Sequence, residues 1–320
     1  MRYSAQPYTT RVTVLEVIQK SAAFLAQRGV DAPRLQTELL LAHVLQLPRM
    51  KLYLNFERTL TDAELATLRE LVKRRGQREP LQHLTGSTSF CGLEMAVSRQ
   101  VLVPRPETEL LAEAGWEFLG KHSTSNIQHP TSKEQRAGSE TGAPAALDFG
   151  TGSGCIAIAL AVKCPAARVV AVDVAAEALA VARHNAGAAG VSERIEFLHG
   201  DGFAALPADA RFDLIVSNPP YIPSAEIASL QPEVRDFDPR GALDGGADGL
   251  DFYRRLAAQA GAFLKPGGRI MLEFGDGQAE EIKKILAAQM WIVEAVKADY
   301  TQRARIIIAK SSSRSSSSSK

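Results

Sequence analysis

Apolar residues near the start of the chain recur three or four positions apart, which is the spacing of one face of an α-helix. Two such stripes consist of Val12, Leu15, Ile18, Ala22 and Leu25, then Leu35, Leu39, Ala42 and Leu45. A third helix is expected to begin at Thr61, because Glu64 completes a capping box. Leu65, Leu68 and Val72 continue that helix. The pattern predicts a small helical domain over residues 1–78.

The pattern changes to strict alternation in the next stretch. Leu93, Met95 and Val97 alternate with other residues inside the strand-like segment 84–103. Alternation with a period of two is typical of a half-buried strand. We therefore predict a β-hairpin over residues 79–103 that links the helical domain to the rest of the chain.

Short apolar strands alternate with helical segments through the remaining residues, 104–310. This order predicts a doubly wound, mainly parallel sheet with helices on both faces. Residues 265–269 form a tight turn before one of these strands. The predicted strands cover residues 145–149, 168–172, 195–198, 212–217, 270–274, 292–296 and 305–309.

Two polar segments carry no apolar period. Residues 121–142 are predicted to be a disordered insertion, and the serine-rich residues 311–320 a disordered tail. With 320 residues the chain exceeds one usual domain. A net charge of +1, no apolar run of membrane length and no apolar signal core at the start favour a cytoplasmic protein that needs neither membrane nor nucleic acid.

A glycine-rich turn follows the first predicted strand of the sheet. Gly150-Thr151-Gly152-Ser153-Gly154 leads into an apolar helix, and glycines let a backbone approach a ligand closely. The next strand ends in Asp173, which can accept both hydroxyls of a ribose. Because Ala157 stands where the third glycine of the dinucleotide fingerprint belongs, the turn favours a nucleoside cofactor without pyrophosphate, such as S-adenosylmethionine.

The stretch Asn218-Pro219-Pro220-Tyr221 follows a predicted buried strand, 212–217. Two prolines end that strand, since neither can donate to a sheet ladder. The Asn218 side chain and the Pro219 carbonyl offer two acceptors for a planar NH₂ group, and Tyr221 offers a ring for its face. The alternative interpretation is a strand-ending turn, which Asn-Pro commonly marks. The glycine turn and Asp173 favour the site.

These motifs together resemble the bacterial release factor glutamine methyltransferases of the HemK/PrmC type. The resemblance runs over residues 12–310 apart from the insertion. It is carried by residues 103–109 (Val-Pro-Arg-Pro-Glu-Thr-Glu), 148–154, 218–223 and 236–246. Gly202 departs from the pattern, because some members carry a large aromatic residue there. Packing against adenine is therefore expected from Phe203 or another residue.

The resemblance implies a Rossmann-like methyltransferase that methylates the glutamine amide in the Gly-Gly-Gln loop of peptide chain release factors. It implies S-adenosylmethionine as cofactor, and we expect a monomer with no metal site. The expected catalytic residues are Asn218, Pro219 and Tyr221, with Pro220 also in contact with the substrate. The expected cofactor contacts are Gly150, Thr151, Gly152, Ser153, Gly154, Asp173, Asp201, Gly202, Phe203 and Asn218.

Three alternatives stay open from the sequence. The stretch Asn218-Pro219-Pro220-Tyr221, called the clamp below, would equally suit a glutamine of a ribosomal protein or the exocyclic amino group of adenine in nucleic acid. A near-neutral charge argues against nucleic acid, because such enzymes usually present a basic surface. A non-catalytic module that binds a nucleoside is the third alternative.

Several polar and charged residues allow two interpretations each. Thr108, with Arg105 and Glu107 beside it, either belongs to the site or lies in the first turn of a capped helix. Asp148 is expected to support the glycine turn, whereas a surface turn is the favoured interpretation of Asp238 and Arg240. The cluster Lys73, Arg74, Arg75 and Arg78 is interpreted as a solvated helix end rather than a partner site.

Overall fold

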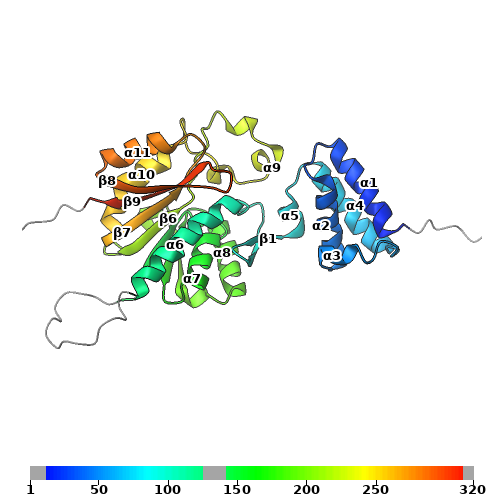
Figure 1. Cartoon of the computed structure of the whole chain (residues 1–320), viewed down its shortest axis with the longest axis horizontal. Helices are drawn as coiled ribbons and strands as arrows, with labels where there is room; N and C mark the ends of the chain where they lie inside the picture. The colour runs from blue at the N-terminus through cyan, green and yellow to red at the C-terminus, as the bar shows by residue number, and fades with distance from the viewer. Residues whose placement is uncertain (1–11, 125–141, 313–320) are drawn as a thin grey trace, which may run out of the picture. The chain divides into compact units, whose positions relative to one another are not determined.

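The computed structural model of the chain describes residues 12–124 and 142–312, which fall into two compact units (Figure 1). Of the described residues, unit 1 contains 12–86 together with 231–237, and unit 2 contains 87–124, 142–230 and 238–312. Most of the predicted insertion and tail lies outside the described residues. Where they overlap, the prediction was wrong, since a helix continues to Thr124 and a strand to Ser311.

Unit 1 is a bundle of short helices around one apolar core. Thr13 and Thr61 each cap a helix, and the predicted capping box between Thr61 and Glu64 is confirmed by both of its hydrogen bonds. The helices are α1 (Val14–Gln27), α2 (Pro33–Leu45), α3 (Arg49–Leu52), α4 (Asp62–Gly76) and α5 (Leu81–Thr85), with α9 (Pro232–Arg235) in the distant segment.

The buried faces of α1 and α2 differ from the predicted stripes. In α1 the core residues include Val14 and Val17, and in α2 they include Leu41, whereas Leu35 is 43% exposed. Both helices carry more apolar residues than one face can hold, so periodicity alone left the phase open. In α4 the predicted core residues Leu65, Leu68 and Val72 are all buried.

Three of the four basic residues at the end of α4 form ion pairs within unit 1, whereas Lys73 is exposed as expected for a solvated helix end. Arg75 is 3% exposed, and its guanidinium donates to Gln36 and to Glu233. Arg78 donates to both carboxylate oxygens of Glu233 at 2.7 Å, and Arg74 pairs with Glu79. These bonds hold the segment 231–237 in unit 1, although residues on either side of it belong to unit 2.

In the described residues, unit 2 contains a seven-stranded sheet in the order β5-β4-β3-β6-β7-β9-β8. The first five strands of that order are parallel, and β9 runs antiparallel to both of its neighbours. The mainly parallel, doubly wound sheet predicted from the sequence is confirmed. Its strands are β3 (Ala145–Phe149), β4 (Arg168–Asp173), β5 (Ile195–His199), β6 (Phe212–Ser217), β7 (Leu264–Glu273), β8 (Trp291–Ala298) and β9 (Ala304–Ser311).

The turn predicted at residues 265–269 lies inside β7 rather than before it. Phe212 pairs with Leu264 and Leu214 pairs with Arg269, so the pairing register shifts between them. Gly267 has a φ of +81°, a conformation that favours glycine. The extra residues therefore form an irregularity within a longer strand.

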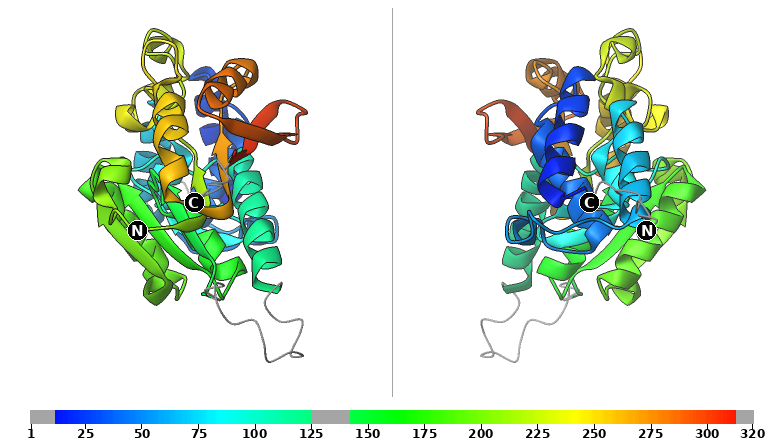
Figure 2. Two further views of the ribbon diagram at one scale, coloured as in Figure 1. Left: turned by 90° about the vertical axis from the view of Figure 1, so that its left-hand side faces the viewer. Right: turned by 90° about the vertical axis from the view of Figure 1, so that its right-hand side faces the viewer.

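Helices cover both faces of the sheet, and each face has its own apolar core (Figures 1 and 2). Leu111, Leu160 and Leu179 belong to the core on one face, and Tyr253 and Ile282 to the core on the other. The first face is covered by α6 (Pro106–Thr124), α7 (Cys155–Lys163) and α8 (Ala176–Ala188), the second by α10 (Asp251–Gln259) and α11 (Ala279–Ala288).

A two-stranded hairpin, β1 (Ser87–Phe90) with β2 (Leu93–Ala96), opens unit 2. Leu84, which was expected in the strand-like segment, lies in α5. Asn185 of α8 is 1% exposed; it accepts from Ala96 N and donates to the carbonyls of Ala96 and Ser153. The hairpin is thereby fixed to the glycine turn. Within the described residues, no helix has the length and apolar character to cross a bilayer.

Candidate functional site

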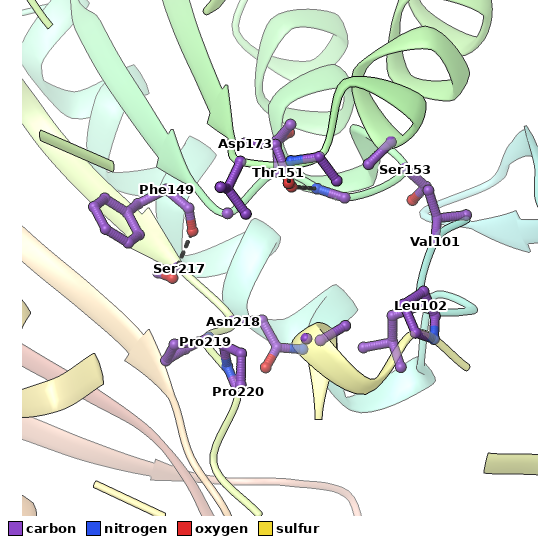
Figure 3. Close-up of a pocket in the computed structure, with 18 of the residues that line it drawn as sticks. Val101, Leu102, Phe149, Thr151, Ser153, Asp173, Ser217, Asn218, Pro219 and Pro220 are labelled. Atoms are coloured by element: carbon purple, nitrogen blue, oxygen red, sulfur yellow. Dashed lines mark hydrogen bonds between the residues drawn. The ribbon is translucent and has the colours of Figure 1, made fainter. Parts of the chain in front are cut away.

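A cavity lies in unit 2 at the carboxyl ends of β3, β4 and β6 (Figure 3). β3 pairs with β4 on one side and β6 on the other, so the chain reverses its direction of travel across the sheet here. Ligands of open α/β sheets bind at such a switch point. Figure 3 shows Thr151, Ser153 and Asp173 on one side of the cavity and Asn218 and the two prolines on the other.

The glycine turn combines backbone hydrogen bonds to β4 with backbone conformations that favour glycine. Gly150 N and Thr151 N both donate to the Val172 carbonyl, at 2.9 and 3.0 Å. Gly152 and Gly154 have φ values of +54° and +80°. A Cβ on Gly154 would lie 3.0 Å from the Ala182 Cβ. The turn therefore combines a left-handed backbone with close packing against Ala182 of α8.

Asp148 supports this turn from below, as the sequence predicted. Its side chain is 1% exposed and accepts from Thr151 Oγ1 at 2.7 Å and from Ala157 N at 3.0 Å. Burial raises the pKa of Asp148 to about 7, while these two hydrogen bonds oppose the rise. The carboxyl group thus joins the start of α7 to the turn.

Asp173 ends β4 with its carboxylate at the cavity. Oδ2 accepts from Gly152 N at 2.8 Å, and Oδ1 accepts from Ala175 N at 2.9 Å. These two bonds fix the carboxylate plane relative to the glycine turn. A carboxylate has about four acceptor positions, so free positions are left for two further donors.

The cavity wall near Asp201 and Gly202 contains an aromatic ring from a different place than expected. Phe203 is 4% exposed and does not line the cavity; its ring packs 4.9 Å from Phe149 and 5.0 Å from Phe263. Phe149 lines the cavity instead. Arg255 donates to Asp201 and lies over the Phe149 ring. Phe203 packs against Phe149, and Phe149 is the ring that lines the cavity.

Asn218 presents its side chain to the cavity from the end of β6. Its Nδ2 donates to Thr108 Oγ1 at 3.1 Å, and Ser217 Oγ donates to the Phe149 carbonyl at 2.6 Å. Pro219 and Pro220 also line the cavity, whereas Tyr221 does not. Burial raises the pKa of Tyr221 to about 12, and Gln278 Nε2 donates to its carbonyl at 2.9 Å. The structure thus brings Asn218 and Pro219 together and leaves the predicted role of Tyr221 without a cavity contact.

The segment that follows the clamp closes another part of the wall. Asp238 is 7% exposed and pairs with Arg105 at 2.7 Å, so the surface turn expected here was wrong. Burial raises the pKa of Asp238, and the charge of Arg105 opposes the rise. The cavity is lined here by Arg105, Pro239, Gly241 and Ala242. Arg240 pairs with Asp244 at 3.1 Å at the surface.

A buried carboxyl group, Glu273, lies next to Asn218, and the sequence analysis missed it. Glu273 is 3% exposed at the end of β7. Burial raises its pKa to about 7; hydrogen bonds from Thr108 and Asn218 lower it, and the charge of Glu107 adds to the rise. A strand ending in an acidic residue, as in Met-Leu-Glu-Phe, was the available signal.

Family models match both parts of the chain. The PrmC N-terminal domain model matches residues 16–86, and the methyltransferase small domain model matches residues 139–230. The first lies in unit 1 and the second in unit 2.

Two curated relatives are similar in sequence over most of this chain. It is 46% identical over 270 residues to a release factor glutamine methyltransferase of Geobacter sulfurreducens, covering 84% of this chain and 87% of that protein. It is 43% identical over 293 residues to a release factor glutamine methyltransferase of Chlorobaculum tepidum, covering 91% and 94%.

Solved structures share the fold at lower identity. The hMettl16 catalytic domain, solved in complex with MAT2A 3'UTR hairpin 1, has a TM-score of 0.50 and 16% identity, covering 80% of this chain and 82% of that chain. At this identity the likeness concerns the fold alone.

Proposed function

The chain belongs to the family of release factor glutamine methyltransferases, and we propose that Asn218 and Pro219 hold the reacting glutamine amide. The enzyme transfers a methyl group to the side chain of a glutamine in a peptide chain release factor. The observation that carries the proposal is the position of Asn218, which lies across one cavity from Asp173 and the glycine turn (Figure 3). The glutamine of the Gly-Gly-Gln loop is the proposed acceptor.

The clamp solves a problem of amide chemistry. An amide nitrogen is a poor nucleophile, because its lone pair is delocalised into the carbonyl group. Asn218 Oδ1 and the Pro219 carbonyl each accept one N–H hydrogen of the substrate amide, which increases the electron density on its nitrogen. Both acceptors belong to a stiff strand end, so the amide is oriented before it reacts. The excess proton leaves to water once the new nitrogen–carbon bond has formed.

The wall opposite the clamp fits S-adenosylmethionine. Asp173 offers carboxylate oxygens to a ribose diol, and the Phe149 ring offers an apolar face to adenine. Of the basic residues, Arg105 lines the cavity, and its charge is paired with Asp238, so the donor set does not suit a pyrophosphate. When bound, S-adenosylmethionine supplies a methyl group on a positively charged sulfur. Gly150, Thr151, Gly152, Ser153 and Asp201 are the further proposed contacts.

Gly202→Ala is expected to weaken S-adenosylmethionine binding by roughly tenfold, because the added Cβ must displace the Phe149 ring and a lost aromatic contact costs about 0.5–1.5 kcal/mol. The Gly202 φ is +59°, and a Cβ would lie 2.5 Å from Phe149 Cε2. The Phe149 ring would therefore shift within the cavity wall. Calorimetric titration of both proteins measures the change in Kd.

Gly190→Ala is the matched control for this substitution. Gly190 has a φ of +69° and no atom within 4 Å of an added Cβ. It shares the backbone cost without the ring contact, so its Kd should equal that of the unchanged protein. Equal Kd values for the two variants would contradict the place given to Phe149.

We assign recognition of the release factor to unit 1. The PrmC N-terminal domain match covers this unit, and its surface exposes Met50 (65%) and Leu54 (77%). Glu233, held by Arg75 and Arg78, belongs to a segment that continues into residues lining the cavity. A small amide clamp offers little selectivity by itself. The monomeric state and a cytoplasmic location remain predictions of this proposal.

The test is to incubate the enzyme with methyl-labelled S-adenosylmethionine and, separately, with release factor, ribosomal protein and DNA. Peptide mass mapping then locates the label. Label on the glutamine of the Gly-Gly-Gln loop is expected. Label on a ribosomal-protein glutamine or on DNA adenine would keep the clamp and overturn the substrate, whereas no label together with tight cofactor binding would favour a binding module.

A further inference from the structure

Glu273 is buried beside the clamp without a counter-ion. It follows Leu272, which pairs with Ser217 on the neighbouring parallel strand, so Glu273 and Asn218 are adjacent at the sheet edge. Within residues 12–124 and 142–312, no cation lies within ion-pair distance of its carboxylate, and Oε2 has no hydrogen-bond partner. Burying such a group is costly. Folding alone gives no reason to place a carboxyl group here.

The charged groups around Glu273 compensate for this burial only in part, because the charge of Arg305 opposes the rise in its pKa. Glu107 on α6 carries the same sign of charge, and Arg305 on β9 pairs with Asp299 at 3.0 Å. On the other sides lie two phenols, Tyr253 of α10 and Tyr221. Tyr253 donates its hydroxyl to the Glu273 carbonyl at 2.7 Å rather than to the carboxylate. The carboxylate is thus left for Thr108 and Asn218.

Among the side chains of Asn218, Thr108 and Glu273, the donor and acceptor of each hydrogen bond are determined by chemistry. Thr108 has a single hydroxyl proton, and it already accepts from Asn218 Nδ2 at 3.1 Å. Its proton is therefore available to the Glu273 carboxylate, and the neighbouring Asn218 amide also lowers the pKa of that group. An ionised carboxylate can only accept. The Asn218 Nδ2 group is consequently directed toward Thr108 and Glu273.

We propose that Glu273, acting with Thr108, is a positioning residue that fixes the Asn218 side chain with Oδ1 toward the substrate amide. The inference rests on the proposed role of Asn218 and deepens it. A planar amide turned by half a revolution occupies the same space but presents two donors to the substrate's NH₂ group. The carboxylate prevents that turn, because Oδ1 would then face a negative charge.

Protonation of Glu273 removes the preference for this orientation of the Asn218 amide. A neutral carboxyl group can donate to Asn218 Oδ1 and so stabilises the turned amide. Burial raises the pKa of Glu273 to about 7. The population of Asn218 with Oδ1 toward the substrate is therefore full above that pH and is lost as the pH falls through it. The rate constant kcat should therefore rise with pH to a plateau near pH 8, with this midpoint.

Glu273→Gln and Thr108→Val are the decisive variants. Each is expected to lower kcat at pH 8 by roughly tenfold, since each removes the equivalent of one or two net hydrogen bonds from the correct orientation. Glu273→Gln should also abolish the acid limb of the pH profile. Thr108→Ser should restore kcat to within about threefold, because it keeps the hydroxyl. The Kd for S-adenosylmethionine and the melting temperature should change little.

A second readout needs no cofactor. In the ligand-free protein, the Asn218 side-chain NH₂ signals, identified by their loss in Asn218→Ala, should titrate with a midpoint near pH 7. This titration should be absent in Glu273→Gln and unchanged in Glu281→Gln, which alters an exposed glutamate of α11. If Glu273→Gln does not fold, Thr108→Val and the titration of the unchanged protein decide.

The outcomes separate this inference from the proposed function. If Asn218→Ala keeps full activity, the clamp itself is wrong. If Asn218→Ala loses activity while both variants keep kcat within about twofold, or the amide signals do not titrate, the clamp stands and Glu273 has no positioning role.

Discussion

Asn218→Ala is expected to lower kcat by roughly a hundredfold or more, because a misplaced reactant or a lost preorganised dipole costs about that factor. The variant loses the acceptor that orients the substrate amide, whereas Pro219 and the opposite wall stay intact. The Kd for S-adenosylmethionine should stay within about twofold, since the cofactor wall is formed by β3 and β4. Single-turnover methylation of the release factor and calorimetric titration measure the two quantities.

Gln289→Ala is the control for loss of a side-chain amide. Gln289 is an exposed residue directly after α11 in unit 2 and does not line the cavity. Its kcat should equal that of the unchanged enzyme. Equal losses of kcat and cofactor affinity in Asn218→Ala would show that Asn218 supports the cofactor wall rather than the reaction.

Asp173→Ala is expected to weaken S-adenosylmethionine binding by roughly a hundredfold, because hydrogen bonds to a charged group contribute ~1.5–3 kcal/mol each. The variant removes the acceptors for a ribose diol and also the bonds that Gly152 N and Ala175 N donate to the carboxylate. Calorimetric titration gives the Kd. At saturating cofactor, kcat should recover to within about threefold, since the clamp lies on the opposite wall.

Asp209→Ala tests whether this effect belongs to the site. Asp209 is an exposed residue between η2 (Gly202–Ala205) and β6, and it does not line the cavity. Its Kd should not change. A normal Kd in Asp173→Ala would refute the assignment of this carboxylate to the ribose.

Much of the site could be predicted from short stretches of sequence, because each part depends on local backbone chemistry. A glycine turn between a strand and a helix, an acidic strand end and two prolines after a strand all restrict φ, ψ or hydrogen bonding within a few residues. In a parallel sheet such strand ends meet at one edge. Gly152, Asp173 and Asn218 were therefore correctly placed around one cavity.

The missed residues depend on contacts between distant parts of the chain. Phe149 replaces Phe203 at the cavity because of how β3 and η2 pack, and Asn185 joins the hairpin to the glycine turn across 89 and 32 positions of sequence. Glu233 reaches Arg78 across 155 positions. Local patterns carry no information about such pairs.

By itself, the sequence determined the alternation of strands and helices, the doubly wound sheet and the motifs at its carboxyl edge, since these follow from side-chain periodicity and from the restricted backbones of glycine and proline. The tertiary structure alone decided which face of α1 and α2 is buried, that Asp238 is covered, and that Glu273 lies beside Asn218. Burial and side-chain partners arise only when separate elements pack together, and they determine the charge and orientation of the groups at this site.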